Sequence, residues 1–477
     1  MLFNSTVFLQ FFAAFLLLYW MCRGSLLARN VLIVVSSYIF YGWWQPVEGQ
    51  WDLRFLGLLF ASSTFDFCVG LGLEKLDNNQ RGRRALLFGS MLVNLGILGL
   101  FKYCNFFIES FANVSNQLGI GIGTRTLEIV LPVGISFYTF QSMSYAIDVY
   151  RRTLPATRNY LNFLAFVSFF PQLVAGPIER ASHLLPQFER TRIIDRSMLQ
   201  EGFWLLVWGM FKKVVLADSL APLVDLVFNG SNASGPATLL ATLAFGLQIY
   251  CDFSGYSDIA RGLARLLGFD IMWNFQLPYT AVNPRDFWRR WHISLSTWLR
   301  DYLYISLGGN RRGLGRTYFN LLATMVLGGL WHGAAWNFVL WGLWHGAGLA
   351  IHRLVAGDSA SPARRSRAVA VVSWMGTMAF VFYGWLLFRA GSLEQVLTLT
   401  GSLGRWTAPP WIGSFALCLV VFALPLVAME LWQKKTNNLL APLRLAPVPR
   451  FVLQGVLIYG IILFWTREKA AFIYFQF

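Results

Sequence analysis

The chain has 477 residues, of which 56% are hydrophobic, 17% aromatic and only 13% charged. A soluble globular domain carries about 25% charged residues, so this composition excludes a soluble enzyme, a disordered chain and a coiled coil. It indicates an integral membrane protein. The formal net charge of +16 is typical of a membrane protein whose cytoplasmic loops collect Lys and Arg, and an added attraction for an anionic substrate or lipid surface stays open. We expect membrane lipids as partners and no nucleic acid.

Apolar runs long enough to cross a hydrocarbon core of about 30 Å follow one another along the chain. They lie at about 3–22, 27–44, 53–73, 85–108, 129–149, 200–228, 236–256, 317–335, 336–352, 369–389, 411–432 and 451–475. The basic loops between them all fall on the cytoplasmic side if the N-terminus starts outside, which leaves the loops at about 111–126 and 229–235 outside. The first run has no preceding positive charge and no small-residue cleavage site, which favours a spanning helix over a signal peptide.

One apolar run breaks this alternation. Residues from about 160 to 178 have basic loops on both sides, and Pro171 and Gly176-Pro177 interrupt the run. Because proline removes a backbone donor and breaks helices, a straight crossing is disfavoured. A re-entrant element on the cytoplasmic side satisfies both facts, provided that its irregular backbone is buried in protein or lines a watery cavity.

The longest stretch without a clear span is about 257–316. Within it, apolar residues recur at spacings of three and four, which predicts a helix lying in or near the membrane interface. The predicted apolar face comprises Phe287, Trp291, Leu295, Trp298, Tyr302 and Ile305, widened by Trp288 and Leu299. The opposite face carries Arg289, Ser296 and Arg300.

The sequence therefore predicts an all-α polytopic protein with about eleven to twelve transmembrane helices plus re-entrant elements. We expect a single membrane domain over 1–477. It would consist of N-terminal helices in 1–149, a re-entrant segment and catalytic core in about 150–353, and C-terminal helices in 369–475.

His332 is the first candidate for chemistry, because it lies inside an apolar segment among small residues, in "LGGLWHGA". The chain has no Asp or Glu between Asp301 and Asp358. A desolvated imidazole without a nearby anion stays neutral, which suits a general base. A histidine that is merely packed between closely apposed helices is the alternative interpretation.

The other histidines give weaker signals. His345 repeats the tripeptide Trp-His-Gly thirteen residues later, so on one continuous helix it would lie on roughly the opposite face from His332 unless the helix breaks at Gly333 or Gly342. His352 shares the face of His345, and two histidines without a third ligand do not predict a metal site. His292 lies at the edge of the apolar stripe, either at the mouth of a cavity or solvated at a rim.

A polar run over residues 250–258, "YCDFSGYSD", is unusual at the end of a spanning helix. Its carboxylates, Asp252 and Asp258, are candidates to orient a histidine or to accept hydrogen bonds from sugar hydroxyls, although a simple helix cap is the alternative. Ser254 and Tyr256 from the same run are candidates for substrate binding. The five cysteines show no CxxC spacing, so neither a metal site nor a disulfide framework is predicted.

These residues resemble one family. The strings from Tyr250 to Arg353 resemble the core of the membrane-bound O-acyltransferases, and more closely the branch with the alginate O-acetylation membrane protein. They read "YCDFSGYSDIARGLARLLGF", "NFQLPY", "FWRRWHISLSTWLRDYLYISLGGNR", "LGGLWHGAAWNF" and "WGLWHG". The resemblance extends over nearly the whole chain through "FNSTVFLQFF", "LPVGISFYTFQSMSYAIDVYR", "FFPQLVAGPIER" and the closing "FIYFQF".

The resemblance implies a helical bundle around a central tunnel, with His332 as the catalytic histidine near mid-membrane. It also implies a second site position at His292, which is asparagine in many eukaryotic relatives. Asn274, Arg289, Arg300 and Trp331 lie in the matching strings and become further candidates for substrate binding.

The implied activity is acyl transfer from a thioester donor to a hydroxyl, with acetyl-CoA or an acyl-carrier thioester as co-substrate and no permanently bound cofactor or metal. The resemblance further implies a bacterial inner-membrane location, a secreted or periplasmic acetyltransferase partner and a polysaccharide synthesis complex. D-alanyl transfer to teichoic acid is the alternative within the family. A non-enzymatic polysaccharide or lipid transporter, or a structural scaffold, is the alternative outside it.

Overall fold

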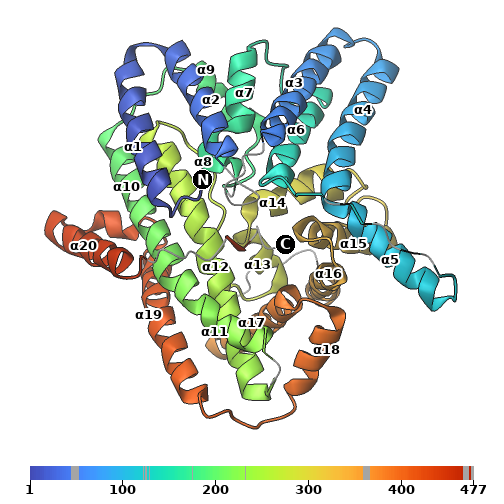
Figure 1. Ribbon diagram of the computed structural model, residues 1–477, viewed down its shortest axis with the longest axis vertical. Helices are drawn as coiled ribbons and strands as arrows, with labels where there is room; N and C mark the ends of the chain where they lie inside the picture. Colours follow the sequence, from blue (N-terminus) through green and yellow to red (C-terminus); the bar gives the residue numbers. More distant parts are fainter. Residues whose placement is uncertain are drawn as a thin grey trace. The chain divides into compact units, whose positions relative to one another are not determined.

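The structure, a computed structural model, describes residues 1–43, 53–121, 123, 126–127, 129–174, 176–230, 233–357, 366–465 and 472–473. All regular elements in this part of the chain are helices, as Figure 1 shows. The chain divides into two compact units: unit 1 comprises Met1–Leu199 with Leu263–Met272, and unit 2 comprises Gln200–Gly262 with Trp273–Phe477. In the sequence, the division falls within the residue ranges of α10 (Arg196–Met210) and α12 (Gly235–Leu266).

Six helical stretches of the described residues are long and apolar enough to cross a membrane. They are Thr6–Gly24, Arg54–Lys75, Gln80–Gln117, Gly235–Leu266, Arg367–Arg389 and Ile412–Thr436, with Leu26–Gly42 and Pro447–Leu463 as shorter apolar helices. The predicted all-α polytopic class is therefore confirmed, because each long apolar helix satisfies its own backbone hydrogen bonds inside a bilayer. Eleven to twelve crossings stay a prediction.

Unit 1 is a set of helices from the N-terminal part of the chain. They are α1 (Thr6–Met21), η1 (Cys22–Gly24), α2 (Leu26–Gly42), α3 (Arg54–Lys75), α4 (Gln80–Leu98), η2 (Gly99–Tyr103), α5 (Cys104–Gln117), α6 (Ile135–Tyr150), α7 (Tyr160–Ser168), α8 (Phe170–Leu173) and α9 (Ala181–Glu189). The predicted loop at about 111–126 is partly wrong, since its first residues continue α5 to Gln117. The short helix α9 was not predicted at all.

The predicted interruption within residues 160–178 is present. Helix α7 ends at Ser168, Phe169 departs from helical geometry, and Pro171 falls in the first turn of α8, where its missing N–H costs nothing. The broken stretch is buried in protein: Phe170 packs 5.1 Å from Phe15 and 5.7 Å from Phe40, measured between ring centroids. The backbone N–H of Phe170 donates to Ser37 Oγ at 3.1 Å, so this irregular backbone is satisfied inside the unit.

Unit 2 holds the remaining helices. Besides α10 and α12 they are η3 (Phe211–Ala217), α11 (Asp218–Phe228), η4 (Pro278–Thr280), α13 (Pro284–Arg290), α14 (Ile293–Trp298), η5 (Leu299–Tyr304), α15 (Leu314–His332), α16 (Trp336–Ala356), α17 (Arg367–Arg389), α18 (Leu393–Ser402), α19 (Ile412–Thr436), η6 (Ala441–Arg444) and α20 (Pro447–Leu463). Residues 466–471 and 474–475 of the predicted last span lie outside the described part of the chain.

The single interfacial helix predicted around residues 287–305 is wrong in one respect. The chain forms α13, α14 and η5 in succession, and His292 interrupts them with left-handed backbone angles, φ 42° and ψ 55°. The predicted apolar stripe is nevertheless the buried face from Phe287 to Tyr302, whereas Ile305 at its end is 50% exposed. The periodicity therefore identified the packed face, and the break follows from contacts that periodicity does not encode.

Candidate active site

His332 is the last residue of α15, and the helix ends there because Gly333 is extended, with φ −157° and ψ 150°. The chain then turns into α16, so of the two positions considered for a break between His332 and His345, Gly333 is the one at which the helix ends. The two helices cross with their backbones in contact: a Cβ on Gly329 would come within 2.2 Å of Phe338 O, and one on Gly342 within 2.4 Å of Met325 O. Small residues thus allow the close helix crossing that positions His332.

Aromatic rings surround His332. Its ring centroid lies 5.2 Å from that of Trp331, 5.1 Å from Trp341 and 5.4 Å from Phe388. The residue is only 4% exposed. This enclosed, largely apolar setting excludes bulk water from the imidazole, while the tunnel implied by the resemblance stays a prediction.

His292 is completely buried at the junction of α13 and α14. Its ring packs edge-on against Phe253 of α12 at 4.6 Å between centroids. Burial lowers the pKa of His292 to about 3, so its imidazole is neutral near pH 7. A non-glycine residue in the left-handed region is uncommon, and such strain persists only where surrounding contacts hold it and is frequent at functional sites.

Asn274 supplies contacts that hold His292 in place. The carbonyl of Asn274 accepts from the N–H of Ile293 at 2.9 Å, and its side-chain oxygen accepts from Ser294 Oγ at 2.9 Å. The side-chain amide donates to Ser257 Oγ of α12 at 3.2 Å. Asn274, predicted as a substrate-binding residue, is therefore engaged with the turn that follows His292, and substrate binding by Asn274 remains a prediction.

The two histidines lie together within unit 2. Their ring centroids are 6.2 Å apart, and Trp331 lies next to both, 5.9 Å from His292 and 5.2 Å from His332. At this separation a single carbonyl group can contact both imidazoles, one acting on a proton and the other on a developing charge. We call His292 and His332 the catalytic pair, because they are the candidate catalytic residues for which a role is proposed below.

The polar run of α12 is engaged with two consecutive lysines of η3. Lys212 Nζ lies 2.8 Å from Asp258 Oδ2 and donates to Ser254 Oγ at 2.9 Å. Lys213 Nζ lies 2.8 Å from Asp252 Oδ1. Buried carboxylates need such partners, because an isolated charge is costly to desolvate.

The other carboxylate oxygen of Asp252 accepts from the N–H of Ile473 at 2.8 Å. Beside it, Phe472 packs 4.3 Å from Tyr256 and 6.0 Å from Phe253, between ring centroids. The described residues 472–473 therefore dock on the same stretch of α12 whose Phe253 supports His292.

The remaining predicted residues are not brought to the catalytic pair by any contact described here. Arg289 and Arg300 are exposed, and Arg300 Nε lies 2.7 Å from Asp301 Oδ1. His345 is fully buried among aromatic rings, 4.8 Å from Trp341 and 5.2 Å from Trp288. Trp341 thus contacts both His345 and His332.

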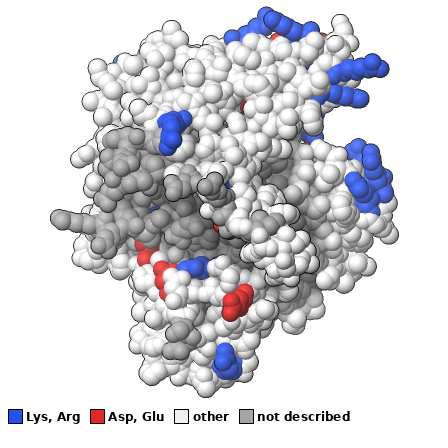
Figure 2. Space-filling view, turned by 45° about the vertical axis from the view of Figure 1, so that its right-hand side comes forward, with Lys and Arg blue, Asp and Glu red and all other residues white. Residues whose placement is uncertain are grey.

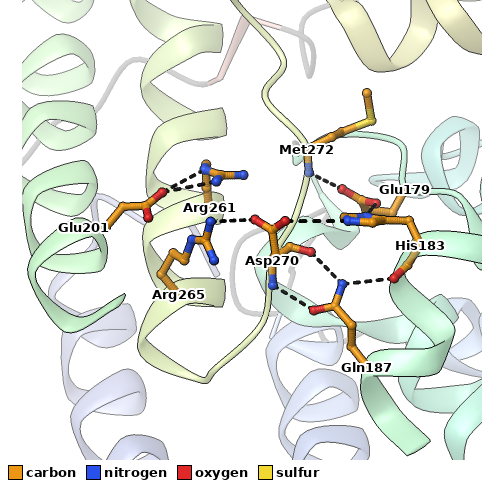
Figure 3. A network of polar contacts seen from close by, with 8 residues as sticks. All are labelled: Glu179, His183, Gln187, Glu201, Arg261, Arg265, Asp270 and Met272. Atoms are coloured by element: carbon orange, nitrogen blue, oxygen red, sulfur yellow. Dashed lines mark hydrogen bonds and ion pairs between the residues drawn. The ribbon is translucent and has the colours of Figure 1, made fainter. Parts of the chain in front are cut away.

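A polar network in unit 1 was missed from the sequence (Figure 3). His183 Nδ1 lies 2.8 Å from Glu179 Oε2 and its Nε2 lies 3.6 Å from Asp270 Oδ2, while Arg265 Nη2 lies 2.8 Å from Asp270 Oδ1. Gln187 exchanges two hydrogen bonds of 2.8 Å with the backbone of Asp270. Gln187 and Asp270 lie 83 positions apart in the chain, so no local pattern connects the two sides of the network, whereas Glu179 and His183 form a local i,i+4 pair.

The same view includes a separate ion pair in unit 2, between Arg261 and Glu201, whose charged atoms lie 3.1 Å apart.

Within the network of unit 1, hydrogen bonding to Asp270 and Glu179 raises the pKa of His183 to about 10. The network in unit 1 therefore ties α9 to the chain that follows α12 and favours a charged imidazole at neutral pH.

Comparison with known proteins agrees with the predicted resemblance. A family model described as MBOAT, membrane-bound O-acyltransferase family, matches residues 151–391. The chain is 45% identical over 413 residues to the probable alginate O-acetylase AlgI of Azotobacter vinelandii, covering 85% of this chain and 79% of that protein. It is 34% identical to the peptidoglycan O-acetyltransferase of Helicobacter pylori over 85% of this chain and 80% of that protein.

A shorter match, 29% identical over 52% of this chain and 63% of the relative, is to the teichoic acid D-alanyltransferase of Streptococcus thermophilus. The family match contains both members of the catalytic pair, and the stronger relatives cover most of the chain. An enzyme is thereby favoured over a transporter or a scaffold. The chain belongs to the membrane-bound O-acyltransferase family and is an acyltransferase.

Proposed function

We propose that this protein moves an acetyl group from a cytoplasmic thioester donor across the bacterial inner membrane for O-acetylation of an exopolysaccharide such as alginate. Its similarity to alginate O-acetylases over most of the chain supports the choice of acyl group and polymer class. The observation that carries the chemistry is the catalytic pair, two buried imidazoles with ring centroids 6.2 Å apart.

In the proposed reaction, the hydroxyl oxygen of the acceptor attacks the carbonyl carbon of the thioester, and neutral His332 takes the hydroxyl proton as the new bond forms. The tetrahedral intermediate then collapses, the carbon–sulfur bond breaks, and the thiolate receives the proton from His332. The products are an oxygen ester and a free thiol, with no oxidant or metal required. The aromatic enclosure of His332 contributes by excluding the water that would hydrolyse the thioester.

His292 is proposed to stabilise the oxyanion. An uncharged imidazole has one N–H group that can donate a hydrogen bond. Because this group is fixed in place before the reaction, it stabilises the negative charge that develops on the carbonyl oxygen without reorganisation. The contacts of Asn274 and Phe253 fix the backbone and ring of His292. In this role His292 contributes only when the carbonyl oxygen becomes negative, which lowers the barrier rather than strengthening donor binding.

The donor is proposed to be acetyl-CoA or an acyl carrier protein. Because the polymer lies on the far side of the membrane, a secreted or periplasmic acetyltransferase would complete the modification within a polysaccharide synthesis complex. The basic loops on the predicted cytoplasmic side suit an anionic donor.

The test is acetyl transfer by purified protein supplied with labelled acetyl-CoA or acetylated carrier protein. We expect His332→Ala to lower the rate by at least about 10²-fold, the usual contribution of a general base. His352→Ala is the matched control, because His352 is a half-buried histidine of α16 outside the aromatic enclosure. Equal activity of His332→Ala and the control, at equal protein level, would exclude the proposed base. Transfer of labelled D-alanine in place of acetyl would assign the chain to the other activity of the family.

A further inference from the structure

Unit 1 contains a cavity of about 710 Å³. Its lining comes from the first two turns of α2, the segment 154–159, the first turn of α7 and the end of α9. Leu26, Leu27 and Leu185 supply apolar wall, whereas Arg158 and Arg190 supply charge. The cavity is therefore amphipathic, which suits a ligand with a charged and an apolar part.

The rim of the cavity is predominantly basic. Arg158 and Arg190 are both exposed, with Glu189 as the carboxylate among the lining residues. Arg158 has one distant ion pair, 3.8 Å to Glu74, in which both side chains are exposed. Exposed pairs of this kind contribute little, so both guanidinium groups are available to an incoming anion.

The floor of the cavity is rigid. Asn30 Nδ2 donates to Asn162 Oδ1 at 2.9 Å and to Phe188 O at 2.8 Å. From behind, Arg192 Nη2 donates to Asn30 Oδ1 at 2.9 Å. Asn30 and Asn162 are nearly inaccessible, so the cavity is a built feature of three packed helices rather than a gap between mobile side chains.

Two buried arginines lie next to the residues that form this floor. Arg29 and Arg192 are 6% and 7% exposed, and Arg29 Nη1 donates to Arg192 O at 3.3 Å. Among the described residues neither makes an ion pair with a carboxylate; Arg192 instead bonds to Tyr19, Asn30 and Gln187. A buried cation without a counter-charge is costly. An anion in the cavity would supply part of the missing charge.

We propose that this cavity binds the phosphate headgroup of an anionic membrane lipid. The guanidinium groups of Arg158 and Arg190 would hold the phosphate in charge-assisted hydrogen bonds, and Leu26 and Leu27 would contact the start of the acyl chains. Figure 2 shows Lys and Arg side chains gathered at the top of its view, where Figure 1 places loops of unit 1. Basic pockets between membrane helices are a known setting for anionic lipids.

A lipid fits better than a soluble phosphate for two reasons. A small hydrophilic ion would lie next to the leucine side chains without forming hydrogen bonds to them, which makes this part of the cavity unfavourable for it. In addition, Leu27 is 67% exposed on a helix of a membrane protein, so an apolar surface leads directly to the cavity. The chemistry proposed at the catalytic pair does not depend on a lipid in this cavity, so failure of the lipid assignment would leave the proposed reaction untouched.

The experiment measures thermal unfolding of the full chain, and lipid retention by native mass spectrometry, in micelles with phosphatidylglycerol or phosphatidylcholine. The test variant is Arg158→Gln with Arg190→Gln. The control is Arg81→Gln with Arg84→Gln, which removes the same charge from exposed positions of α4 in the same unit. We expect phosphatidylglycerol to stabilise the wild type and the control, and to bind the test variant at least tenfold more weakly.

A second variant, Arg190→Glu, should weaken phosphatidylglycerol binding more than Arg190→Gln, because it places a like charge against the phosphate. Equal phosphatidylglycerol binding by the test variant and the control would overturn the proposal. Displacement of the lipid by inorganic phosphate at matched concentration would overturn the lipid assignment in favour of a soluble ion. Displacement of the lipid by free CoA would also overturn the lipid assignment, and would show that the cavity binds the acyl donor instead.

Discussion

At the scale of single residues, Asn274 is expected to act on catalysis through His292. Asn274→Ala removes the side-chain bonds to Ser294 and Ser257, which frees the left-handed turn to relax. A displacement of about 1 Å at a reacting group costs on the order of 10²-fold in rate. We therefore expect kcat for acetyl transfer to fall strongly while KM for the donor changes little.

The control for this prediction is Asn283→Ala. Asn283 caps α13 by accepting from the N–H of Asp286 at 2.7 Å, so its loss should cost about 1 kcal/mol of stability and leave kcat of the folded protein unchanged. If Asn274 acts through His292, the double variant with His292→Ala loses no more activity than His292→Ala alone. Independent, additive losses would show that Asn274 has another role.

The two histidines of the catalytic pair can be singled out from the sequence as candidates, whereas the contacts that hold them cannot. His332 and His292 lie in motifs, "LGGLWHGA" and "RRWHIS", that can be read directly. The hydrogen bonds from Ser294 to Asn274 and from Asn274 to Ser257 join positions about 20 residues apart. Hydrogen-bond partners at that separation depend on the fold, and the positive φ of His292 depends on them in turn.

At the scale of elements, the crossing of α15 and α16 should be sensitive to one methyl group. Gly329→Ala would place a Cβ 2.2 Å from Phe338 O, a backbone atom that cannot move aside. We expect a loss of about 1–3 kcal/mol in unfolding free energy, as for other overpacked sites. Chemical denaturation in detergent, followed by circular dichroism, measures it.

Gly315→Ala is the matched control in the same helix, because a Cβ there meets nothing within 4 Å. Alanine is the better helix former, so this variant should be neutral or slightly stabilising. Equal destabilisation by both substitutions would mean that helix propensity or expression, and not the crossing, determines the outcome.

The pH dependence of unit 1 should follow His183. Its folded pKa of about 10 lies above the ordinary value of 6.5, because Asp270 and Glu179 favour the charged ring. The stabilisation is therefore complete below pH 6.5 and is lost as the pH rises through about 10. Because the side chain is 43% exposed, solvent screening limits the effect to about 1 kcal/mol.

The measurement compares unfolding midpoints of wild type and His183→Gln between pH 6.5 and 10. The difference between the two unfolding midpoints should shrink as the pH rises, because deprotonation of His183 removes the charge interaction with Asp270 and Glu179 that the variant already lacks. A difference that stays constant over this range would mean that His183 contributes by packing alone.

Long apolar helices were predictable from the sequence because their signal is local. The ends of α3, α17 and α19 lie within a few residues of the predicted runs. Helices α9 and α18 were missed, since short helices without a long apolar run carry little periodic signal. The break at His292 was missed because an apolar stripe continues through it, and only the backbone geometry interrupts it.

At the scale of the whole molecule, the distribution of basic loops predicts a topology. The loops around Arg81–Arg84 and Arg151–Arg158 should lie on the cytoplasmic side, and the loop at 229–235 outside. We expect Asn78→Cys and Thr153→Cys, in a background without the native cysteines, to react with an impermeant maleimide only after the cytoplasmic face is opened. Asn229→Cys should react in intact cells.

All three positions are exposed within their own units, so labelling reports the side of the membrane rather than burial. Labelling of Thr153→Cys in intact cells would contradict the re-entrant assignment of residues 160–178, because the basic loop before them would then lie outside.

The left-handed turn at His292 also limits evolutionary exchange at that position. Asn, Asp and Gly adopt such backbone angles at small cost, whereas branched or bulky side chains do so only under strain. Asparagine would preserve the bend and still offer an amide N–H, so ring chemistry can be traded for amide chemistry without refolding the loop. The backbone conformation thus restricts this position to a few residue types. Exchange among those residue types can change the reaction while the architecture stays the same.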